Sequence, residues 1–502
     1  MSTHPLTKSR QISERWVIEG DLMLQTPTHL GNGDSDSIVD MPLLLDEATG
    51  KALLPGTSLA GALRNYVYER RHGFGVRLVN RDGKRVFDRV IEALFGAEKE
   101  NKDGAQSALI IDDALGEDPK IELRDGVRID PVTRTARIDF EKGKPRGYKY
   151  DLQLIEAGTT FPLHLELLIG QTVDPQDVKK MLALALQGLA EGEIAIGLRK
   201  RRGFGECRVT AWRVQRYDLK QAADLIAWLA LEHPDWGYAP AQPPQTGKDI
   251  AALLGVSLAG AEDRRSSCAI RATFVLDGSL LIRSGFGEQD RGPDAVHLHS
   301  ARPDGSRRPV LSGTSLAGAL RHRAERIVRT ISNGHPSAII DNIFGPAEIT
   351  GGEEKVKASR LVVKEAVIEN PLDLVQNRIR IDRFTGSVHG TGLFNEQPVF
   401  GKEDTLVTID LMLRNPADAE IGLLLLAIKD LWTGDLPLGG EVSIGRGRLR
   451  GVRATITTPQ HKDAPLTIEA AQDGRLTISN RKALESYVEA LHEYVRTAEV
   501  TR

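Results

Sequence analysis

The sequence contains one stretch twice, Leu54-Pro-Gly-Thr-Ser-Leu-Ala-Gly-Ala-Leu-Arg64 and Leu311-Ser-Gly-Thr-Ser-Leu-Ala-Gly-Ala-Leu-Arg321. Nine consecutive residues, from the glycine to the arginine, are identical in the two copies. Chance similarity between two helices of this composition is a poor explanation for such an identity. We therefore interpret the chain as a duplication, in which the stretch marks equivalent positions of two units.

Each copy is typical of a strand end, a glycine turn and a helix start. The hydroxyl residues after each glycine are expected to cap the first helical turn; they are Thr57, Ser58, Thr314 and Ser315. Gly61 and Gly318 fall inside the helix, where glycine costs about 1 kcal/mol relative to alanine, so we expect them to permit close approach of another backbone. Two interpretations explain the stretch equally well at the local level. One is a turn that packs a strand against a helix, and the other is a phosphate site at the free amides of the helix start.

The composition limits the function classes. At 502 residues the chain is too long for one core, and the duplication favours two large domains. The formal net charge of -3 excludes a generally basic nucleic-acid binder but allows local basic grooves. Two cysteines cannot form a disulfide framework or a four-cysteine zinc site. The N-terminus has no apolar signal core, and no run approaches the roughly 18 apolar residues of a membrane span, so we expect a cytoplasmic protein without a membrane segment.

Further paired signatures keep the same order in both units. Leu94-Phe-Gly96 corresponds to Ile343-Phe-Gly345, and Arg128-Ile-Asp-x-x-Thr133 corresponds to Arg380-Ile-Asp-x-x-Thr385. The polar segment after each Arg-Ile-Asp is predicted to be a projecting hairpin, which has little core to bury and is suited to contact. A strand, a helix, a glycine loop and a last strand follow in each unit. The order βαββαβ favours a ferredoxin-like, mainly antiparallel sheet.

The glycine loops at residues 197–205 and 439–447 are the clearest binding signal. Their glycines have matched spacing and allow a backbone to approach a ligand closely. Basic residues in and after them supply charge for phosphates; these are Arg199, Lys200, Arg201, Arg202, Arg446, Arg448 and Arg450. A solvated basic turn would explain one such loop, but two matched loops favour binding. Neither contains the Gly-Lys-Ser/Thr of a Walker loop.

A segment rich in proline, glutamine and glycine separates the units. The predicted boundaries are a first domain at residues 1–235, a linker at 236–262 and a second domain at 263–502. A helical period at residues 218–230 precedes the linker, and a helix at about residue 481 to 496 ends the chain. We expect these two helices to occupy equivalent positions.

Taken in order, the motifs resemble the RAMP (repeat-associated mysterious protein) superfamily, and in particular the backbone subunits of type III CRISPR effector complexes, with two units fused in one chain. The resemblance rests on Asp40-Met-Pro-x-x-x-Asp46, the repeated helix start, Leu-Phe-Gly, Arg-Ile-Asp-x-x-Thr, Gly-Thr-x-Phe and the terminal Gly-x5-Gly-x-Gly, and it spans nearly the whole chain. It implies an α+β fold of two tandem ferredoxin-like (RRM-like) RAMP domains with inserted thumb hairpins. The implied partners are crRNA, target RNA and other CRISPR effector subunits, including further RAMP subunits.

The resemblance also implies which residues contact RNA. The glycine loops and the face around the repeated helix start would hold the phosphates of the guide. The thumbs, at about residues 130–149 and 382–400, would wedge between bases of the guide–target duplex. The implied RNA-binding residues are Gly56, Thr57, Ser58, Arg64, Gly197, Arg199, Lys200, Arg201, Arg202, Gly203, Gly205, Gly313, Thr314, Ser315, Arg321, Gly439, Gly440, Gly445, Arg446 and Gly447.

The loop aspartate before the repeated helix start is the residue that, by the resemblance, cleaves target RNA. It corresponds to Asp40 and, at the equivalent place, to Asp294, although the loop after Asp294 is three residues longer. A carboxylate near a scissile phosphate can hold Mg²⁺ or Mn²⁺ or help activate the ribose 2′-hydroxyl, so both aspartates are also candidate metal ligands. Asp34 and Asp36 are rivals for the first position. Without the resemblance, a turn or cap role is the simpler interpretation of a loop aspartate.

Two alternatives to metal-dependent target cleavage stay open. Other RAMP proteins process the precursor guide with histidine, and His297, His299 and His389 lie in suitable loops, but the first unit lacks counterparts. The second alternative is a non-catalytic backbone subunit that binds crRNA without cutting. We rank guide processing below target cleavage, and mutation of the two aspartates separates cleavage from a purely structural role.

Overall fold

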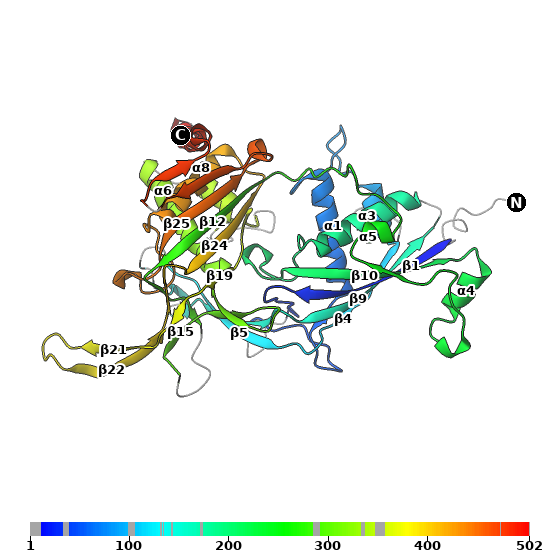
Figure 1. Ribbon diagram of the computed structural model, residues 1–502. Coiled ribbons are helices and arrows are strands. Elements are labelled where there is room, and N and C mark those ends of the chain that lie inside the picture. Colours follow the sequence, from blue (N-terminus) through cyan, green and yellow to red (C-terminus); the bar gives the residue numbers. More distant parts are fainter. Residues whose placement is uncertain are drawn as a thin grey trace.

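Two mainly antiparallel sheets, one in each half of the chain, organise the computed structural model (Figure 1). It describes residues 12–33, 40–98, 106–130, 133, 135–141, 144–170, 174–284, 292–332, 337–346, 357–471 and 473–500. We call the part before strand β12 (Ser267–Asp277) the first half and the part from β12 onward the second half. The predicted α+β class with antiparallel sheets is confirmed.

The first half builds a five-stranded sheet. Its order is β11 (Gln245–Gly247), β10 (Cys207–Asp218), β1 (Glu14–Leu24), β9 (Thr160–Ile169) and β3 (Leu109–Ile111). Neighbouring strands are antiparallel, and burial alternates along β9 because successive side chains point to opposite faces of a sheet. Cys207 is buried, and burial raises the pKa of its thiol to about 12.

Three helices complete the core of the first half: α1 (Gly56–His72), α2 (Arg89–Phe95) and α3 (Pro175–Ala190). Helix α1 buries Leu59, Leu63 and Val67, which recur at helical spacing on one face. Helix α3 begins at Pro175 because Asp174 caps it, accepting a hydrogen bond from the backbone N–H of Gln176. The buried residues of these helices and of the sheet form one hydrophobic cluster.

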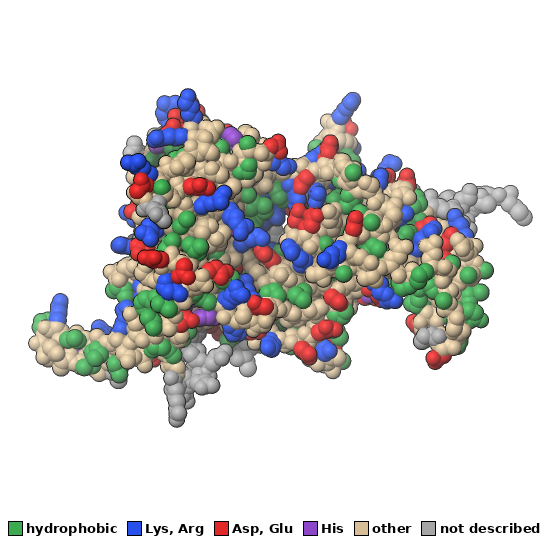
Figure 2. All heavy atoms as spheres, viewed as in Figure 1, with side chains coloured by type: hydrophobic (Ala, Val, Ile, Leu, Met, Phe, Trp, Pro, Cys, Tyr) green, Lys and Arg blue, Asp and Glu red, His purple; other side chains and the backbone are tan. Residues whose placement is uncertain are grey.

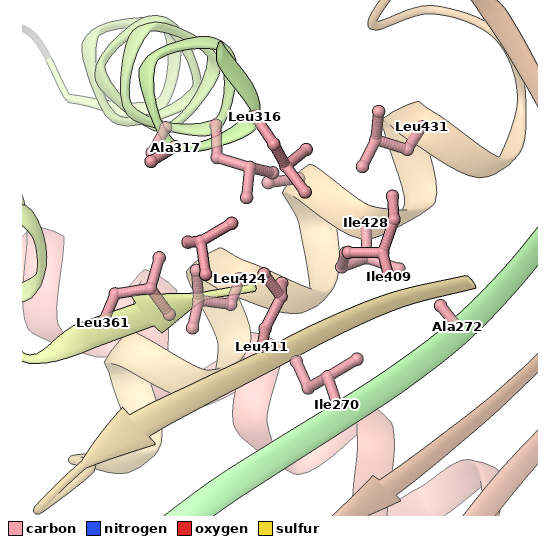
Figure 3. Packing of buried hydrophobic residues seen from close by; sticks show 14 of the residues in the cluster. Ile270, Ala272, Leu316, Ala317, Leu361, Ile409, Leu411, Leu424, Ile428 and Leu431 are labelled. Atoms are coloured by element: carbon pink, nitrogen blue, oxygen red, sulfur yellow. The ribbon is translucent and has the colours of Figure 1, made fainter. Parts of the chain in front are cut away.

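The second half builds a nine-stranded sheet. Its order is β16 (His299–Ala301), β17 (Arg307–Leu311), β19 (Ala366–Glu369), β24 (Leu406–Arg414), β12, β25 (Arg448–Thr457), β26 (Leu466–Ala470) and β27 (Leu476–Ile478), with β18 (Leu361–Val363) also paired to β24. Its helices are α6 (Gly313–Ile331), α7 (Ser337–Phe344), α8 (Asp418–Trp432) and α9 (Arg481–Val500). Figure 3 shows the core between them, where Leu316 of α6 and Leu424 of α8 lie over Ile270 and Leu411 of the sheet.

The central strands follow one order in both halves. That order is β10-β1-β9-β3 in the first half and β25-β12-β24-β18 in the second. The first two of these strands in the chain are separated by α1 and α2, or by α6 and α7, and the last two by α3 or by α8. The duplication seen in the sequence is therefore also a repetition of strand order.

Each half also has hairpin strands outside its main sheet. Strands β21 (Gln376–Ile381) and β22 (Val388–Gln397) project from the second half, as the sequence predicted, and carry apolar side chains on their surface (Figures 1 and 2). Phe384, between them, is 84% exposed. In the first half β5 (Ile121–Val127) pairs with β8 (Lys149–Ile155), and β6 (Ile138–Glu141) pairs with β7 (Lys144–Gly147). The apolar surface of β21 and β22 is available for contact rather than for the core.

Short strands join these parts. They are β2 (Leu53–Leu54), β4 (Ala114–Leu115), β13 (Ser279–Leu280), β14 (Arg283–Ser284), β15 (Ala295–His297), β20 (Leu372–Asp373) and β23 (Val399–Phe400). No helix in the described ranges has the length and apolar character that a membrane crossing needs.

Two local predictions about the repeated stretch were wrong. Helices α1 and α6 begin at Gly56 and Gly313, so the residues in the N-cap position are Pro55, whose ring cannot cap, and Ser312, whose hydroxyl accepts from the N–H of Ser315. A Cβ added at Gly61 or Gly318 meets no described atom within 4 Å. The close approach is at the helix start instead, because a Cβ at Gly56 would lie 2.1 Å from the carbonyl oxygen of Ile111.

The expected equivalence of the inter-domain helix and the last helix was also wrong. Helix α4 (Ala222–Leu229) packs against β10 through Ala227, whereas α9 packs along α8. Between β10 and β12, the helix that packs on α3 is α5 (Ile250–Leu253), which buries Ile250 in the first core. Residues 245–254 thus lie on the first half, and the domain boundaries themselves stay a prediction.

Candidate functional site

Asp40 lies beside strand β8, which pairs with β5 in the first half. Its Oδ2 accepts a hydrogen bond of 2.9 Å from the backbone N–H of Asp151 in β8. The next residue, Met41, forms a parallel bridge to Leu152 of the same strand. Asp40 itself is exposed. The hairpin backbone therefore fixes this carboxylate at the surface.

Asp294 occupies the same place in the second half. Its Oδ2 accepts a hydrogen bond of 2.8 Å from the backbone N–H of Asn395 in β22. Strand β15, which follows Asp294, pairs in parallel with β22, as Met41 does with β8. Asp294 is exposed as well. The longer turn after Asp294 does not change its position relative to the hairpin.

Further carboxylates lie beside Asp40. Asp125 of β5 is directly opposite Asp151 of β8. A hydrogen bond between these two carboxyl groups raises the pKa of Asp151, and the nearby negative charge of Asp40 acts in the same direction. Lys149 pairs with Asp125 at 3.4 Å. The first site therefore combines the anchored carboxylate of Asp40 with the carboxyl group of Asp151, whose pKa is raised.

The glycine loops give the two sites different charges. Arg199 donates a hydrogen bond of 2.5 Å to the hydroxyl of Tyr150, the neighbour of Asp151, and lies over its ring. Glu441 has the corresponding place in the second half, since both residues have φ of 57° and precede a short 3₁₀ turn. Glu441 pairs with Arg283 at 3.0 Å. One site has a loop cation, and the other has an ion-pair network.

No group of three His, Cys, Asp or Glu residues within the described ranges could hold a metal ion. Each site supplies one anchored aspartate, and the rivals Asp34 and Asp36 lie outside the described residues. Mg²⁺ in proteins is commonly held by one or two carboxylates together with phosphates and water. Asp40 and Asp294 would each supply one carboxylate to such an ion, with the remaining ligands coming from RNA and water.

The glycines of both loops are required by the backbone. Gly197, Gly203, Gly439 and Gly445 all have φ between 76° and 89°, a region that side chains rarely adopt. The 3₁₀ turns they frame are Lys200–Arg202 and Val442–Ile444. The two loops have one backbone shape and different side chains.

The basic turn of the first loop contacts the second half. Arg201 donates to the carbonyl oxygen of Ser359, and Arg202 donates to that of Leu361 at 3.1 Å. Burial lowers the pKa of Arg202 to about 10. A Cβ at Gly203 would lie 2.3 Å from the backbone nitrogen of Glu365. We call the contact between residues 197–206 and residues 359–365 the junction.

Arg446 of the second loop is buried in its own half. It pairs with Glu396 at 3.0 Å and with Glu441 at 2.9 Å. Burial and the neighbouring Glu441 raise the pKa of Glu396. In the first half an apolar cluster of Leu152, Leu154 and Phe204, with Met41 packed against it, lies between the hairpin strand and the loop. The hairpin base is thus supported by apolar packing in one half and by buried ion pairs in the other.

Some of the remaining predicted RNA-binding residues are exposed, and others form hydrogen bonds or ion pairs within the protein. Thr57 and Ser58 are exposed at the start of α1. Arg64 pairs with Glu98 at 3.4 Å. Arg321 uses three nitrogens, toward Glu325, Asp341 and the carbonyl oxygen of Gly345. Thr314 and Ser315 share hydrogen bonds with Ser312. Gly205, Gly440 and Gly447 complete the loops.

The histidines do not form a site. His297 is buried, its Nδ1 accepts from the N–H of Ile282, and its Nε2 lies 3.0 Å from the carbonyl oxygen of Val310. Burial lowers its pKa to about 4, so its imidazole is neutral at physiological pH. His299 lies 3.9 Å from Asp373, and His389 is exposed on β22. The role of His297 is to hold β15 in place.

Comparison with known families agrees with this repeated architecture. Residues 21–208 and residues 273–450 each match the model of one family, the RAMP superfamily. The matches cover more than half of the chain, which therefore belongs to the RAMP superfamily. Membership implies ferredoxin-like domains and a role in binding crRNA within CRISPR complexes, in a superfamily that includes both nucleases and non-catalytic subunits. No curated protein matches the chain.

Sequence reasoning missed the residues that hold the aspartates. The anchors are the backbone N–H groups of Asp151 and Asn395, and a backbone donor leaves no side-chain signature. The pair of Tyr150 and Arg199 was missed because the two residues are far apart in the sequence. Asp125 and Asp151 face each other across β5 and β8, and they would have indicated this site only if the pairing register of the two strands had been known.

Proposed function

We propose that this chain is a backbone subunit of a type III CRISPR effector complex, built of two tandem ferredoxin-like RAMP domains, that binds crRNA and target RNA and cleaves the target. The proposal is supported by the family membership and by the repeated strand order. One observation carries the nuclease part. Asp40 and Asp294 are exposed carboxylates, each anchored by a backbone N–H at the base of a hairpin.

The proposed chemistry is transesterification within the target strand. A carboxylate oxygen of Asp40 or Asp294 accepts the proton of a ribose 2′-hydroxyl, and the resulting oxyanion attacks the adjacent phosphorus. The bond from phosphorus to the 5′-oxygen of the next nucleotide breaks, and that oxygen takes up a proton. The products are a 2′,3′-cyclic phosphate and a 5′-hydroxyl. Mg²⁺ or Mn²⁺, if held by one aspartate together with the RNA, would neutralise phosphate charge there.

RNA binding is proposed for the exposed basic and apolar surfaces. Arg199 lies at the first site, and the exposed apolar hairpin β21–β22 suits contact with bases. Arg201, Arg202, Arg321 and Arg446 donate to backbone carbonyl oxygens or carboxylates of the protein, whereas Arg199 contacts the neutral side chain of Tyr150. We therefore expect these four to organise the subunit, and we expect a direct phosphate contact from Arg199.

The test is cleavage of end-labelled target RNA by the assembled complex with Mg²⁺. The variants are Asp40→Ala, Asp294→Ala and the double variant, with Glu47→Ala as the control because Glu47 is an exposed turn residue shortly after Asp40. Each single variant should lose one cut by about 10²- to 10⁴-fold, the usual contribution of general acid–base catalysis, and retain target binding. Chelation of divalent ions tests the metal requirement.

The same experiment decides against the alternatives. Unchanged cutting by the double variant would overturn the nuclease proposal, and guide-dependent binding without any wild-type cut would leave a non-catalytic scaffold. Guide processing by His297 is disfavoured because its imidazole is buried and neutral.

A further inference from the structure

The junction shows how an arginine-bearing glycine turn binds the other half of this chain. In it, the 3₁₀ turn Lys200–Arg202 lies against β18 and the start of α6. A Cβ at Gly313 would lie 2.4 Å from the carbonyl oxygen of Arg202. The side chain of Glu365 is only 2% exposed there and pairs with Arg124 at 2.8 Å. The second half therefore presents a surface shaped for an arginine-bearing glycine turn.

The first half has an equivalent surface, at which Asp112 and Asp113 are exposed. Ser107 Oγ donates to the carbonyl oxygens of Leu94 and Leu109, as Ser359 Oγ donates to those of Ile343 and Leu361. Asp113 holds the place of Glu365, and Gly56, whose N–H donates to Asp113 at 2.7 Å, holds that of Gly313. We call Gly56, Ser107, Leu109, Asp112 and Asp113 the acceptor face.

The charge of the acceptor face suits a basic protein segment. Asp112 and Asp113 are both exposed, whereas the corresponding pair at the junction is Lys364 and Glu365. Two adjacent carboxylates repel RNA phosphates and attract guanidinium groups. The acceptor face is therefore more acidic than the surface that already binds Arg201 and Arg202.

The second glycine loop lacks the arginine pair of the first loop. The second loop has Val442, Ser443 and Ile444 where the first has Lys200, Arg201 and Arg202. Ile444 is 52% exposed, and a Cβ at Gly445 meets no described atom within 4 Å, in contrast to Gly203 at the junction. The second loop has the backbone shape for docking but not the donors.

We propose that the acceptor face binds a glycine turn carrying an arginine pair on a different protein chain. We also propose that the second glycine loop of one copy does not bind the acceptor face of another copy. Such head-to-tail contacts are heterologous, so matching ends would generate an open filament of copies. Because Ser443 and Ile444 stand where the first loop has two arginines, copies of this chain do not form that filament. The acceptor face and the second loop then contact two different neighbouring proteins. This proposal names a partner within the assembly proposed above, but its test requires neither RNA nor cleavage.

The test is the mass of the full chain in solution, by light scattering at micromolar concentration. Wild type should be monomeric. The variant Ser443→Arg with Ile444→Arg places an arginine pair on the second loop and should at least double the weight-average mass. Adding Asp112→Lys and Asp113→Lys should restore the monomer. A matched control instead adds Asp304→Lys and Asp473→Lys, the same charge change at two exposed turn residues, and should leave the association intact.

Three results would overturn the proposal. They are a grafted variant that stays monomeric with the melting temperature of wild type, association that persists after the Asp112 and Asp113 changes, and a wild-type chain that already self-associates through these aspartates. RNA binding by all variants is measured in parallel. Failure of the association test with RNA binding retained would leave the proposed function standing.

Discussion

Two glycines on helix α6 have opposite roles, although both belong to the repeated stretch. A Cβ at Gly313 would lie 2.4 Å from the carbonyl oxygens of Arg202 and Val363. Gly318 has no described atom within 4 Å of an added Cβ and sits in helical backbone. We expect Gly313→Ala to destabilise the protein by about 1–3 kcal/mol through overpacking, and Gly318→Ala to stabilise it by up to about 1 kcal/mol.

Denaturant unfolding of the two variants measures this difference. The pair is matched in chemistry and in helix, so helix propensity alone predicts the same sign for both. Equal stabilisation by the two substitutions would show that the start of α6 is not in close contact with the junction.

His297 gives the second prediction at this scale, because burial lowers its pKa to about 4. An unfolded histidine has a pKa of about 6.5, so between these values the unfolded chain binds a proton that the native chain does not. The free energy of unfolding therefore falls as the pH falls through this window. His297→Gln should remove this dependence. The difference in free energy of unfolding between the variant and wild type should therefore be smaller at pH 5 than at pH 7.5, by about 2 kcal/mol.

Thermal or denaturant unfolding at the two pH values tests the prediction. His389→Gln is the control, since His389 is exposed and should not change the pH dependence. A gap for His297→Gln that is independent of pH would mean that the native state accepts the proton on His297.

At the scale of the element, the hairpin β21–β22 exposes apolar residues that the core does not use. Phe384 is 84% exposed, so its removal should not change the melting temperature. Stacking of a base on an aromatic ring contributes about 1–3 kcal/mol, so Phe384→Ala should weaken target binding by the guide-loaded complex by about 5- to 150-fold. Leu476→Ala, on exposed strand β27, is the control. Equal affinity for both variants would exclude base contact by Phe384.

The elements were more predictable than their contacts. Paired signatures such as Leu94-Phe-Gly96 and Ile343-Phe-Gly345 located the strands and helices of both halves, because glycine turns and apolar periods are local properties. Asp40 and Asp294 were placed by the order of motifs. Their backbone anchors depend on the pairing of the hairpin with the loop, which a sequence does not record.

In the whole molecule, the basic run of residues 199–202 shows that charge in the sequence does not determine which groups an arginine contacts. In the sequence it has the composition of a phosphate site. In the structure Arg201 and Arg202 donate to carbonyl oxygens of the second half, partners more than a hundred residues away. Acidic and basic side chains lie close together on the face shown in Figure 2. The long-range packing of two units, rather than local charge, decides what an arginine binds.

The junction also contains buried ion pairs, and they give the last prediction. Glu365 accepts from Arg124 at 2.8 Å and from Arg302 at 3.0 Å. Burial alone would lower the pKa of Arg124, but Glu365 and Glu122 raise it. Glu365→Gln leaves two guanidinium groups with less negative charge around them, and breaking a buried pair costs about 3–5 kcal/mol. We expect the junction to loosen before either core unfolds.

Hydrogen exchange of the full chain measures this loosening directly. In Glu365→Gln, backbone amides of Leu361–Val363 and Lys200–Arg202 should exchange faster, while those of β1 and β12 should keep their wild-type rates. Glu369→Gln is the matched control, because the Glu369 carboxylate is 53% exposed and lies 3.9 Å from Arg308, where an ion pair contributes at most about 1 kcal/mol. Unchanged exchange at the junction in Glu365→Gln would mean that backbone contacts of the glycine turn, rather than the buried charges, hold the two halves together.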